Sequence, residues 1–246
     1  RKVVNGHFPG IGPDKYPLLL GHESVGTVEE TGAKVTSFRP GDRVIGGLLL
    51  TPTDPRYSSG WGADSDYVLV TDHAAMVVDG VADEAHDWSD GFQVMRKVPS
   101  DIPLEAAGLL CTWREVHAAF SDFPLREGQD ILVFGAGPVG LTFCRLARLK
   151  GLRWIGVVDP LAPKRHAAQR MGADEVFEPD SLSLRDLVKT RGSPLDAVID
   201  AVGSERIINA GIPLLKMAGA LCVYGVVASP RITVDKERGP YNFNIF

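Results

Sequence analysis

The sequence predicts an α/β protein in which a mostly β first domain precedes a second domain built on a doubly wound parallel sheet. Residues 1–98 are rich in Gly, Pro and Asp and contain short β-type runs separated by turn residues, as in irregular β domains. Beyond residue 129, apolar strand-like runs alternate with helix-length segments, which indicates βαβ units. A glycine-rich turn at 135–140 joins one such strand to a helix.

The first domain is expected to consist of short strands, and a helix over 103–120 is predicted to bridge it to the second domain. The strands are expected at 24–29, 43–45, 67–70 and 76–78.

The second domain is expected to alternate strands with helices over 139–150 and 164–171. Gly151 and Gly172 end these helices in the C-cap role. The strands are expected at 131–134, 154–158, 197–199 and 220–224.

The charge and the cysteine content exclude several classes of function. The net charge of −5 offers no basic face to a phosphate backbone, so we expect no nucleic-acid partner. No apolar run approaches the roughly 18 residues that span a membrane, and the first residues lack the features of a secretory signal. The 3 cysteines lie far apart and exclude both a disulfide framework and a Cys-x-x-Cys zinc cluster. We expect the protein in a reducing cytoplasm.

The turn at 135–140 has the spacing Gly-x-Gly-x-x-Gly, and its place between a strand and a helix gives it weight. Gly135 permits a tight turn, Gly137 lets the backbone approach a pyrophosphate, and Gly140 lets the helix pack close to the sheet. The positive end of the helix dipole would face the phosphates. The alternative is a glycine turn in another kind of α/β protein.

An acidic residue closes the next predicted strand. Asp159 lies about 20 residues after Gly140, where a carboxylate accepts hydrogen bonds from the adenosine ribose. A 2′-phosphate would meet that negative charge, so the sequence favours NAD over NADP. Lys164 and Arg165 follow closely and could weaken this discrimination.

A second motif, Gly-His-Glu-Ser-Val-Gly, stands at 21–26. It resembles the zinc signature of the medium-chain alcohol dehydrogenases, a family with a GroES-like catalytic domain and a Rossmann domain. The resemblance covers nearly the whole chain and extends to 41–44, 172–174 and 224–226. It implies an incomplete GroES-like domain over 1–112 and a Rossmann dinucleotide-binding domain over 113–246.

The resemblance implies a catalytic zinc site. His22 is expected to ligate zinc, and Glu23 is an acidic neighbour that either ligates zinc or exchanges with solvent. Cys111 stands where the family has its last protein ligand. Catalytic zinc takes three protein ligands and leaves a fourth position open. The alternative role for Cys111 is that of a small buried hydrophobic residue.

The resemblance also implies contacts to the cofactor and to the substrate. Besides the glycine turn, the cofactor is expected to contact Pro138, Val139, Val202, Gly203, Tyr224, Gly225 and Val226. The substrate pocket is expected to include Leu48, Trp61 and Trp113, although core packing explains each of these residues equally well.

The sequence departs from the family pattern at its two ends. No cysteine precedes His22, whereas the family's first ligand is a cysteine upstream of it. The opening residues are similar to those that follow this cysteine in the sorbitol and glucose dehydrogenase branch, so we expect the ligand to lie before Arg1. Lys2 takes the place of a relay histidine or is an exposed lysine. The family's return to the catalytic domain is also missing after 246, so this domain is expected to be incomplete at both ends.

Two further departures lie within the first domain. Residues 45–65 contain none of the four cysteines that hold a structural zinc in many relatives, so we expect one catalytic zinc and no structural zinc. Residues 79–95 are acidic and look inserted. They are expected to form a solvated loop or a lid over the substrate cleft.

These patterns predict a zinc-dependent oxidoreductase that transfers a hydride between an alcohol and NAD, with a polyol or a sugar secondary alcohol as the substrate implied by resemblance. The full-length enzyme is expected to form a homo-oligomer. One alternative is a zinc-free relative that reduces quinones or enoyl compounds. Another is an inactive nucleotide-binding fragment.

Overall fold

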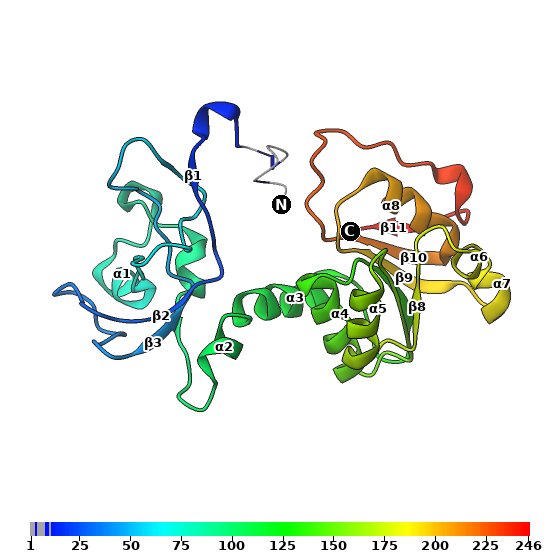
Figure 1. Cartoon of the computed structure of the whole chain (residues 1–246), viewed down its shortest axis with the longest axis horizontal. Coiled ribbons are helices and arrows are strands. Elements are labelled where there is room, and N and C mark those ends of the chain that lie inside the picture. The colour runs from blue at the N-terminus through cyan, green and yellow to red at the C-terminus, as the bar shows by residue number, and fades with distance from the viewer. Residues whose placement is uncertain (1–2, 4–7, 10) are drawn as a thin grey trace. The chain divides into compact units, whose positions relative to one another are not determined.

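The structure, a computed structural model, describes residues 3, 8–9 and 11–246. It contains two compact units, Gly12–Thr112 and a second unit that includes Trp113–Phe246 (Figure 1). The described residues before Gly12 belong to the second unit, whereas the sequence analysis assigns them to the first domain. No described helix combines the length and the apolar character that crossing a membrane requires.

The Gly12–Thr112 unit is built on short strands joined by long loops. An antiparallel sheet contains β2 (Val25–Thr27), β3 (Arg43–Ile45) and β5 (Arg96–Lys97). A separate parallel pair consists of β1 (Leu18–Leu19) and β4 (Ser58–Ser59). The strands expected at 24–29 and 43–45 are confirmed, the first in shorter form. The strand expected at 67–70 is reduced to one bridge, between Leu69 and Leu48.

The strand expected at 76–78 is wrong, because these residues lie in helix α1 (His73–Asp79). Asp72 caps this helix by accepting a hydrogen bond of 3.1 Å from the Ala75 backbone N–H. Gly80 ends the helix in the left-handed conformation, at a φ of 69°. The two caps outweigh the strand preference of the β-branched residues between them.

Residues 79–95 are packed against their unit and do not form a fully solvated loop. They contain two 3-10 turns, Glu84–His86 and Asp90–Val94. Phe92 and Met95 are buried in the core. The Trp88 indole N–H donates a hydrogen bond of 3.0 Å to Nδ1 of His73, which fastens the middle of the segment to α1.

The second unit contains a parallel sheet of 6 strands in the order β11-β10-β9-β6-β7-β8. The strands are β6 (Asp130–Phe134), β7 (Trp154–Val158), β8 (Glu175–Phe177), β9 (Leu195–Asp200), β10 (Leu215–Val223) and β11 (Asn244–Ile245). The strands expected at 131–134 and 154–158 are confirmed. The run expected at 197–199 lies within β9, and the run expected at 220–224 overlaps the end of β10. The chain reverses its direction of travel across the sheet between β6 and β9, which places a topological switch point there.

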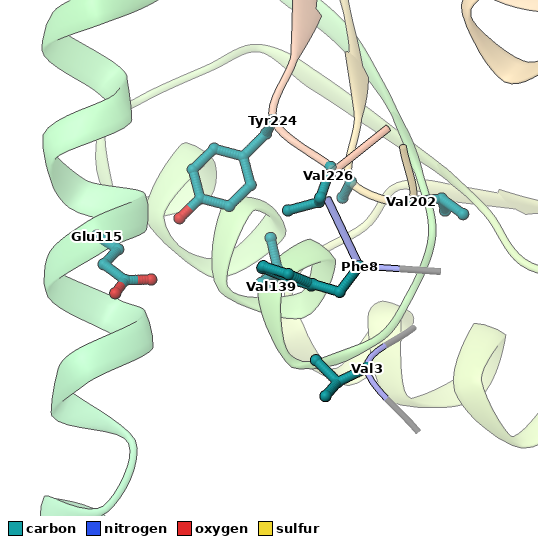
Figure 2. A pocket seen from close by; sticks show the side chains of 9 residues that line it. Val3, Phe8, Glu115, Val139, Val202, Tyr224 and Val226 are labelled. Carbon is teal, nitrogen blue, oxygen red and sulfur yellow. The ribbon is translucent and has the colours of Figure 1, made fainter. Parts of the chain in front are cut away.

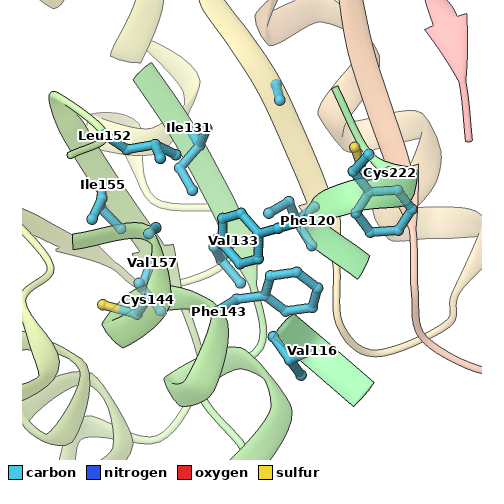
Figure 3. Close-up of a cluster of buried hydrophobic side chains, with 14 of the residues drawn as sticks. Val116, Phe120, Ile131, Val133, Phe143, Cys144, Leu152, Ile155, Val157 and Cys222 are labelled. Atoms are coloured by element: carbon cyan, nitrogen blue, oxygen red, sulfur yellow. The ribbon is translucent and has the colours of Figure 1, made fainter. Parts of the chain in front are cut away.

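Helices cover both faces of this sheet. They are α4 (Pro138–Leu149), α5 (Ala162–Met171), α6 (Leu182–Arg185), α7 (Leu187–Arg191) and α8 (Glu205–Gly211). On one face, Ile131 and Val133 pack with Phe143 of α4 (Figure 3). On the other face, Leu132 packs in a second cluster with Ile208 of α8. β6 is fully buried because both faces are covered, as expected of a central parallel strand.

The helix expected over 103–120 is divided into α2 (Leu104–Ala107) and α3 (Leu110–Asp122). Gly108 follows α2, and glycine is a poor helix former. Val116 and Phe120 of α3 belong to the first of the two core clusters, so packing fixes which side of α3 faces the sheet.

Candidate functional site

The glycine turn at the end of β6 forms the first half of the candidate cofactor site. Gly135 has a φ of 101°, which favours glycine. A Cβ added to Gly140 would stand 1.8 Å from the carbonyl oxygen of Gly135, so only glycine fits there. Gly137 precedes Pro138, the first residue of α4, and a Cβ at Gly137 would meet no protein atom within 4 Å. The turn thus leaves space at the positive end of α4, where a phosphate group can lie.

Asp159 follows β7 and supports the glycine turn. Its buried carboxylate accepts hydrogen bonds of 2.9 Å from the backbone N–H groups of Ala136 and Leu161. Arg165 donates to the Asp159 carbonyl oxygen at 2.7 Å, whereas Lys164 is exposed on α5. A carboxylate has about four lone-pair sites, so Asp159 retains capacity to accept hydrogen bonds from a ribose.

Asp200, at the end of β9, organises the second half of the site. Its fully buried carboxylate accepts hydrogen bonds from the backbone N–H groups of Val202, Gly203 and Ser204, at 2.8, 2.9 and 3.0 Å. Asp200 is not among the residues predicted for the site. The available signal was an aspartate directly after a buried apolar strand and three residues before a glycine.

The ends of β9 and β10 approach each other closely at two glycines. The Asp200 carbonyl oxygen accepts hydrogen bonds from the backbone N–H groups of Tyr224 and Gly225, at 3.0 and 2.8 Å. A Cβ at Gly203 would stand 2.2 Å from the carbonyl oxygen of Val226, and one at Gly225 would stand 2.0 Å from the Gly203 nitrogen. Side chains at either glycine would therefore push the two loops apart.

A pocket of about 360 Å³ opens at this edge of the sheet (Figure 2). Its described lining consists of Val3, Phe8, Glu115, Val139, Ala201, Val202, Tyr224, Gly225 and Val226. Five of the residues predicted to contact the cofactor thus come together here, from α4, from the loop after β9 and from the loop after β10. The other residues predicted to contact the cofactor lie in the glycine turn, at or shortly after Asp159, and at Gly203, where the loops after β9 and β10 meet.

Tyr224 carries the one phenol of the described lining. Its ring packs edge-on against Phe143 with the centroids 5.1 Å apart. Burial, and then the nearby carboxylate of Glu115, raise the pKa of Tyr224 to about 12. The hydroxyl therefore keeps its proton at neutral pH and can donate a hydrogen bond.

The three residues predicted to hold zinc all lie in the Gly12–Thr112 unit. His22 is exposed, and its ring lies 5.8 Å from the ring of Trp61. Glu23 accepts a hydrogen bond from the Thr112 hydroxyl through Oε1. Cys111 is buried in an apolar cluster with Ile45, Val98 and Ala107.

Over residues 3, 8–9 and 11–246, no three side chains of His, Cys, Asp or Glu are grouped so that they could hold a metal ion. The assignment of His22, Glu23 and Cys111 as zinc ligands therefore stays a prediction. In the structure, Glu23 is engaged by Thr112, while Cys111 packs among apolar side chains. Imidazole, carboxylate and thiolate are side chains that suit zinc chemically.

The residues predicted for the substrate pocket lie in different places. Trp61 contacts His22, as above, and is partly exposed. Leu48 is half-buried in the bridge to Leu69, and Trp113 is exposed on α3. A groove of about 750 Å³ runs along β2 and β3, and none of the three predicted substrate residues is part of its described lining. The relay position assigned to Lys2 lies outside the described residues.

Cys144 and Cys222 belong to the core of the second unit, as expected from the sequence (Figure 3). Burial raises the pKa of each thiol to about 12. Both residues therefore stay neutral and act as small hydrophobic side chains.

The second unit has the features of a dinucleotide-binding domain: a doubly wound parallel sheet, a glycine turn at a helix N-terminus and a pocket beside the switch point. Residues 138–239 match the family described as zinc-binding dehydrogenase, and residues 2–80 match the alcohol dehydrogenase GroES-like domain. The chain belongs to the zinc-dependent medium-chain alcohol and polyol dehydrogenase family, whose fold combines a GroES-like and a Rossmann domain.

Relatives with assigned names agree with this family. The NADP-dependent isopropanol dehydrogenase of Thermoanaerobacter brockii is 32% identical over 222 residues, which cover 87% of this chain and 62% of that protein. D-xylulose reductase A of Aspergillus oryzae is 29% identical over 214 residues, or 83% of this chain and 58% of that protein. The chain thus spans less than two thirds of the length of these curated relatives.

The fold is shared with solved structures. Zinc dependent alcohol dehydrogenase 2 from Streptococcus pneumonia superposes with a TM-score of 0.73 at 22% sequence identity, covering 100% of this chain and 70% of that structure. The family uses zinc and a nicotinamide cofactor. The glycine turn and the pocket fit such a cofactor, because they provide a phosphate site at the switch point and an open, mostly apolar pocket beside it.

Proposed function

We propose that this protein is a nicotinamide-dependent oxidoreductase that acts on alcohols, with polyols or sugar secondary alcohols as the substrate class. The observation that carries the proposal is the pocket of about 360 Å³ beside a turn that requires glycine at Gly135 and Gly140. The relatives named as a xylulose reductase and an isopropanol dehydrogenase support the alcohol or ketone class of substrate.

The two halves of the site would hold the two halves of the cofactor. The N-terminus of α4 lies at the switch point, where it would bind the pyrophosphate. Asp159 lies at the end of β7, on the side expected for the adenosine. The pocket lies at the ends of β9 and β10, on the opposite side, and would hold the nicotinamide ring. The bound cofactor would accept or donate the hydride. The chain's own part is to orient the ring and, through Val139, Val202 and Val226, to exclude water.

We further propose that NAD is preferred to NADP. Asp159 carries the argument, because its carboxylate lies beside the glycine turn and would repel a 2′-phosphate. One relative is named as NADP-dependent, so the preference rests on Asp159 of this chain and not on the family.

The metal part of the proposal is one catalytic zinc ion, with His22 and Cys111 as ligands and Glu23 as a ligand or an acidic neighbour. The Gly-His-Glu motif and the family membership support it. The described positions of these side chains do not add support, so the ligands need a direct test. A homo-oligomeric state of the full-length protein is part of the same proposal and can be measured by light scattering.

Titration with NADH tests the proposed function first. Binding should enhance the fluorescence of the reduced nicotinamide ring, because the apolar pocket shields the ring from water. Oxidation of a panel of polyols and simple alcohols with NAD should then identify the substrate class. Absence of saturable binding of NADH and of NADPH would overturn the proposal.

A zinc-free reductase of quinones or enoyl compounds is the second candidate function. Reduction of a quinone that continues in the presence of a strong chelator, together with no oxidation of any alcohol, would establish this alternative.

A further inference from the structure

The pocket that would receive the nicotinamide ring has one charged residue in its described lining. Valine, alanine, glycine and aromatic side chains make up most of this lining, and Glu115 of α3 is the exception. Figure 2 shows the Glu115 carboxylate directed from α3 toward the side of the pocket where the Tyr224 hydroxyl lies. This carboxylate gives the pocket a negative charge on this side.

The position of Glu115 is fixed by the packing of α3. Val116 and Phe120 are buried in the core cluster against the sheet. Successive helical residues are about 100° apart around the axis, so Glu115, which precedes Val116, projects from the edge of the surface that α3 packs against the core. The effect of Glu115 on Tyr224 indicates the same closeness, because the carboxylate contributes to the raised pKa of the phenol.

The two redox forms of a nicotinamide cofactor differ in charge at the ring. The oxidised ring is a cation, the reduced ring is neutral, and the phosphates are the same in both forms. A fixed carboxylate beside the ring therefore stabilises the oxidised form selectively, and charge placed near the ring is a known way in which proteins tune a cofactor.

We propose that Glu115 is a specificity-determining residue that makes this site bind the oxidised cofactor more tightly, relative to the reduced cofactor, than the apolar pocket alone would. This inference rests on the proposed function, and it adds which redox form the pocket favours and which side chain sets the preference. Tyr224 lies beside the carboxylate but carries no charge at neutral pH, so the preference is assigned to Glu115 alone.

The test measures the dissociation constants of NADH, by its fluorescence, and of NAD, by displacement of NADH, for the wild-type chain and for Glu115→Gln. Glutamine keeps the size of the side chain and removes its charge. A unit charge about 4 Å from the ring in an aqueous environment corresponds to about a fivefold change in affinity. Glu115→Gln should therefore weaken NAD by about three- to tenfold and leave NADH within about twofold of the wild type.

Asp122→Asn is the matched control, because it removes a negative charge from the same helix about two turns away and outside the described lining of the pocket. It should leave the ratio of the two constants unchanged. Raising the salt concentration from about 0.05 M to about 0.5 M should shrink the effect of Glu115→Gln, because an exposed charge is screened.

Equal weakening of both forms, or an unchanged ratio, would overturn the inference while leaving the proposed function intact. A purely steric role would also show itself as an effect of Glu115→Gln that does not respond to salt. A wild-type chain that binds neither form would overturn both the inference and the proposed function. Urea unfolding of each variant separates these outcomes from a loss of fold.

Discussion

The backbone carbonyl of Asp200 accepts a hydrogen bond of 2.8 Å from the N–H of Gly225, and this contact joins the ends of β9 and β10 at the rim of the cofactor pocket. The carboxylate of the same aspartate holds the loop after β9 through three further backbone N–H groups. One buried residue thus positions both loops that would enclose the nicotinamide ring.

Asp200→Ala is expected to weaken NADH binding by at least about tenfold and to lower the free energy of unfolding by about 1–3 kcal/mol, because three buried N–H groups lose their acceptor. Fluorescence titration and urea unfolding measure the two effects. Asp130→Asn is the control. Asp130 is also buried, but it lies at the start of β6 and pairs with Arg153 and Arg191. Asp130→Asn should reduce stability, but the folded fraction of this variant should bind NADH as the wild type does. Equal losses of NADH binding in both variants would contradict the role assigned to Asp200.

Two glycines of the same turn are expected to respond differently to alanine. Gly140→Ala should destabilise the second unit by about 1–3 kcal/mol or prevent its folding, because the new Cβ collides with the Gly135 carbonyl oxygen. Gly137→Ala should leave stability nearly unchanged and weaken NADH binding, because the new methyl group meets no protein atom and fills the space for the pyrophosphate. Gly137→Ala with normal binding would show that the phosphates lie elsewhere.

Much of the second unit could be predicted because its sequence signals are local. The buried run at 154–158 became β7 with the expected bounds, and the helix caps at Gly151 and Gly172 follow from the left-handed conformation that both glycines adopt. Residues 76–78 were predicted wrongly because two β-branched residues suggested a strand, although Asp72 and Gly80 were local signals for a capped helix.

The candidate site shows the same division between local and long-range information. Gly135 could be predicted from the spacing of its motif, and Val139 from the resemblance to the family. Asp200 and Glu115 could not, because their roles depend on which loop or helix packs beside them. The zinc set illustrates the converse: His22 and Cys111 stand in a recognisable pattern, but a pattern does not determine whether the side chains converge.

Asp159 is expected to control the choice between NAD and NADP. Asp159→Asn removes the charge that would repel a 2′-phosphate, so the ratio of NADPH to NADH affinity should rise by about tenfold or more. Asn keeps one oxygen acceptor, whereas Asp159→Ser cannot easily reach both Ala136 and Leu161 and should also destabilise the turn. Comparing the dissociation constants of NADH and NADPH measures the effect. A wild-type chain that already prefers NADPH would refute the assignment.

The zinc proposal predicts at most one tightly held zinc ion per chain. Cys111→Ser and His22→Ala should each weaken zinc binding by at least about 10–100-fold, as loss of supporting groups already does. Cys144→Ala is the matched control, since that thiol is buried in the core of the other unit. Elemental analysis after dialysis against a weak chelator gives the zinc content. Two retained ions, or equal retention in wild type and Cys111→Ser, would refute the ligand assignment.

The stability of the Gly12–Thr112 unit should depend on pH through Asp72. Burial by itself would raise the pKa of this carboxyl, but hydrogen bonds from Ser37, Thr36 and Ala75 outweigh it and hold the pKa well below its usual value. Because the folded pKa lies below the unfolded value of about 3.9, the stabilisation is fully present above about pH 5 and is lost as the pH falls through the folded pKa.

Asp72→Asn should therefore lower the free energy of unfolding by about 1–3 kcal/mol at neutral pH, because the amide provides one acceptor where the carboxylate provides two and places a donor against a backbone N–H. The difference from wild type should narrow as the pH falls below about 4, since wild-type Asp72 then begins to take up its proton on unfolding. Urea unfolding at a series of pH values, with the exposed Asp14→Asn as control, measures this difference. A gap between wild type and Asp72→Asn that stays constant down to about pH 3 would mean that the hydrogen bonds of Asp72 do not depend on its charge.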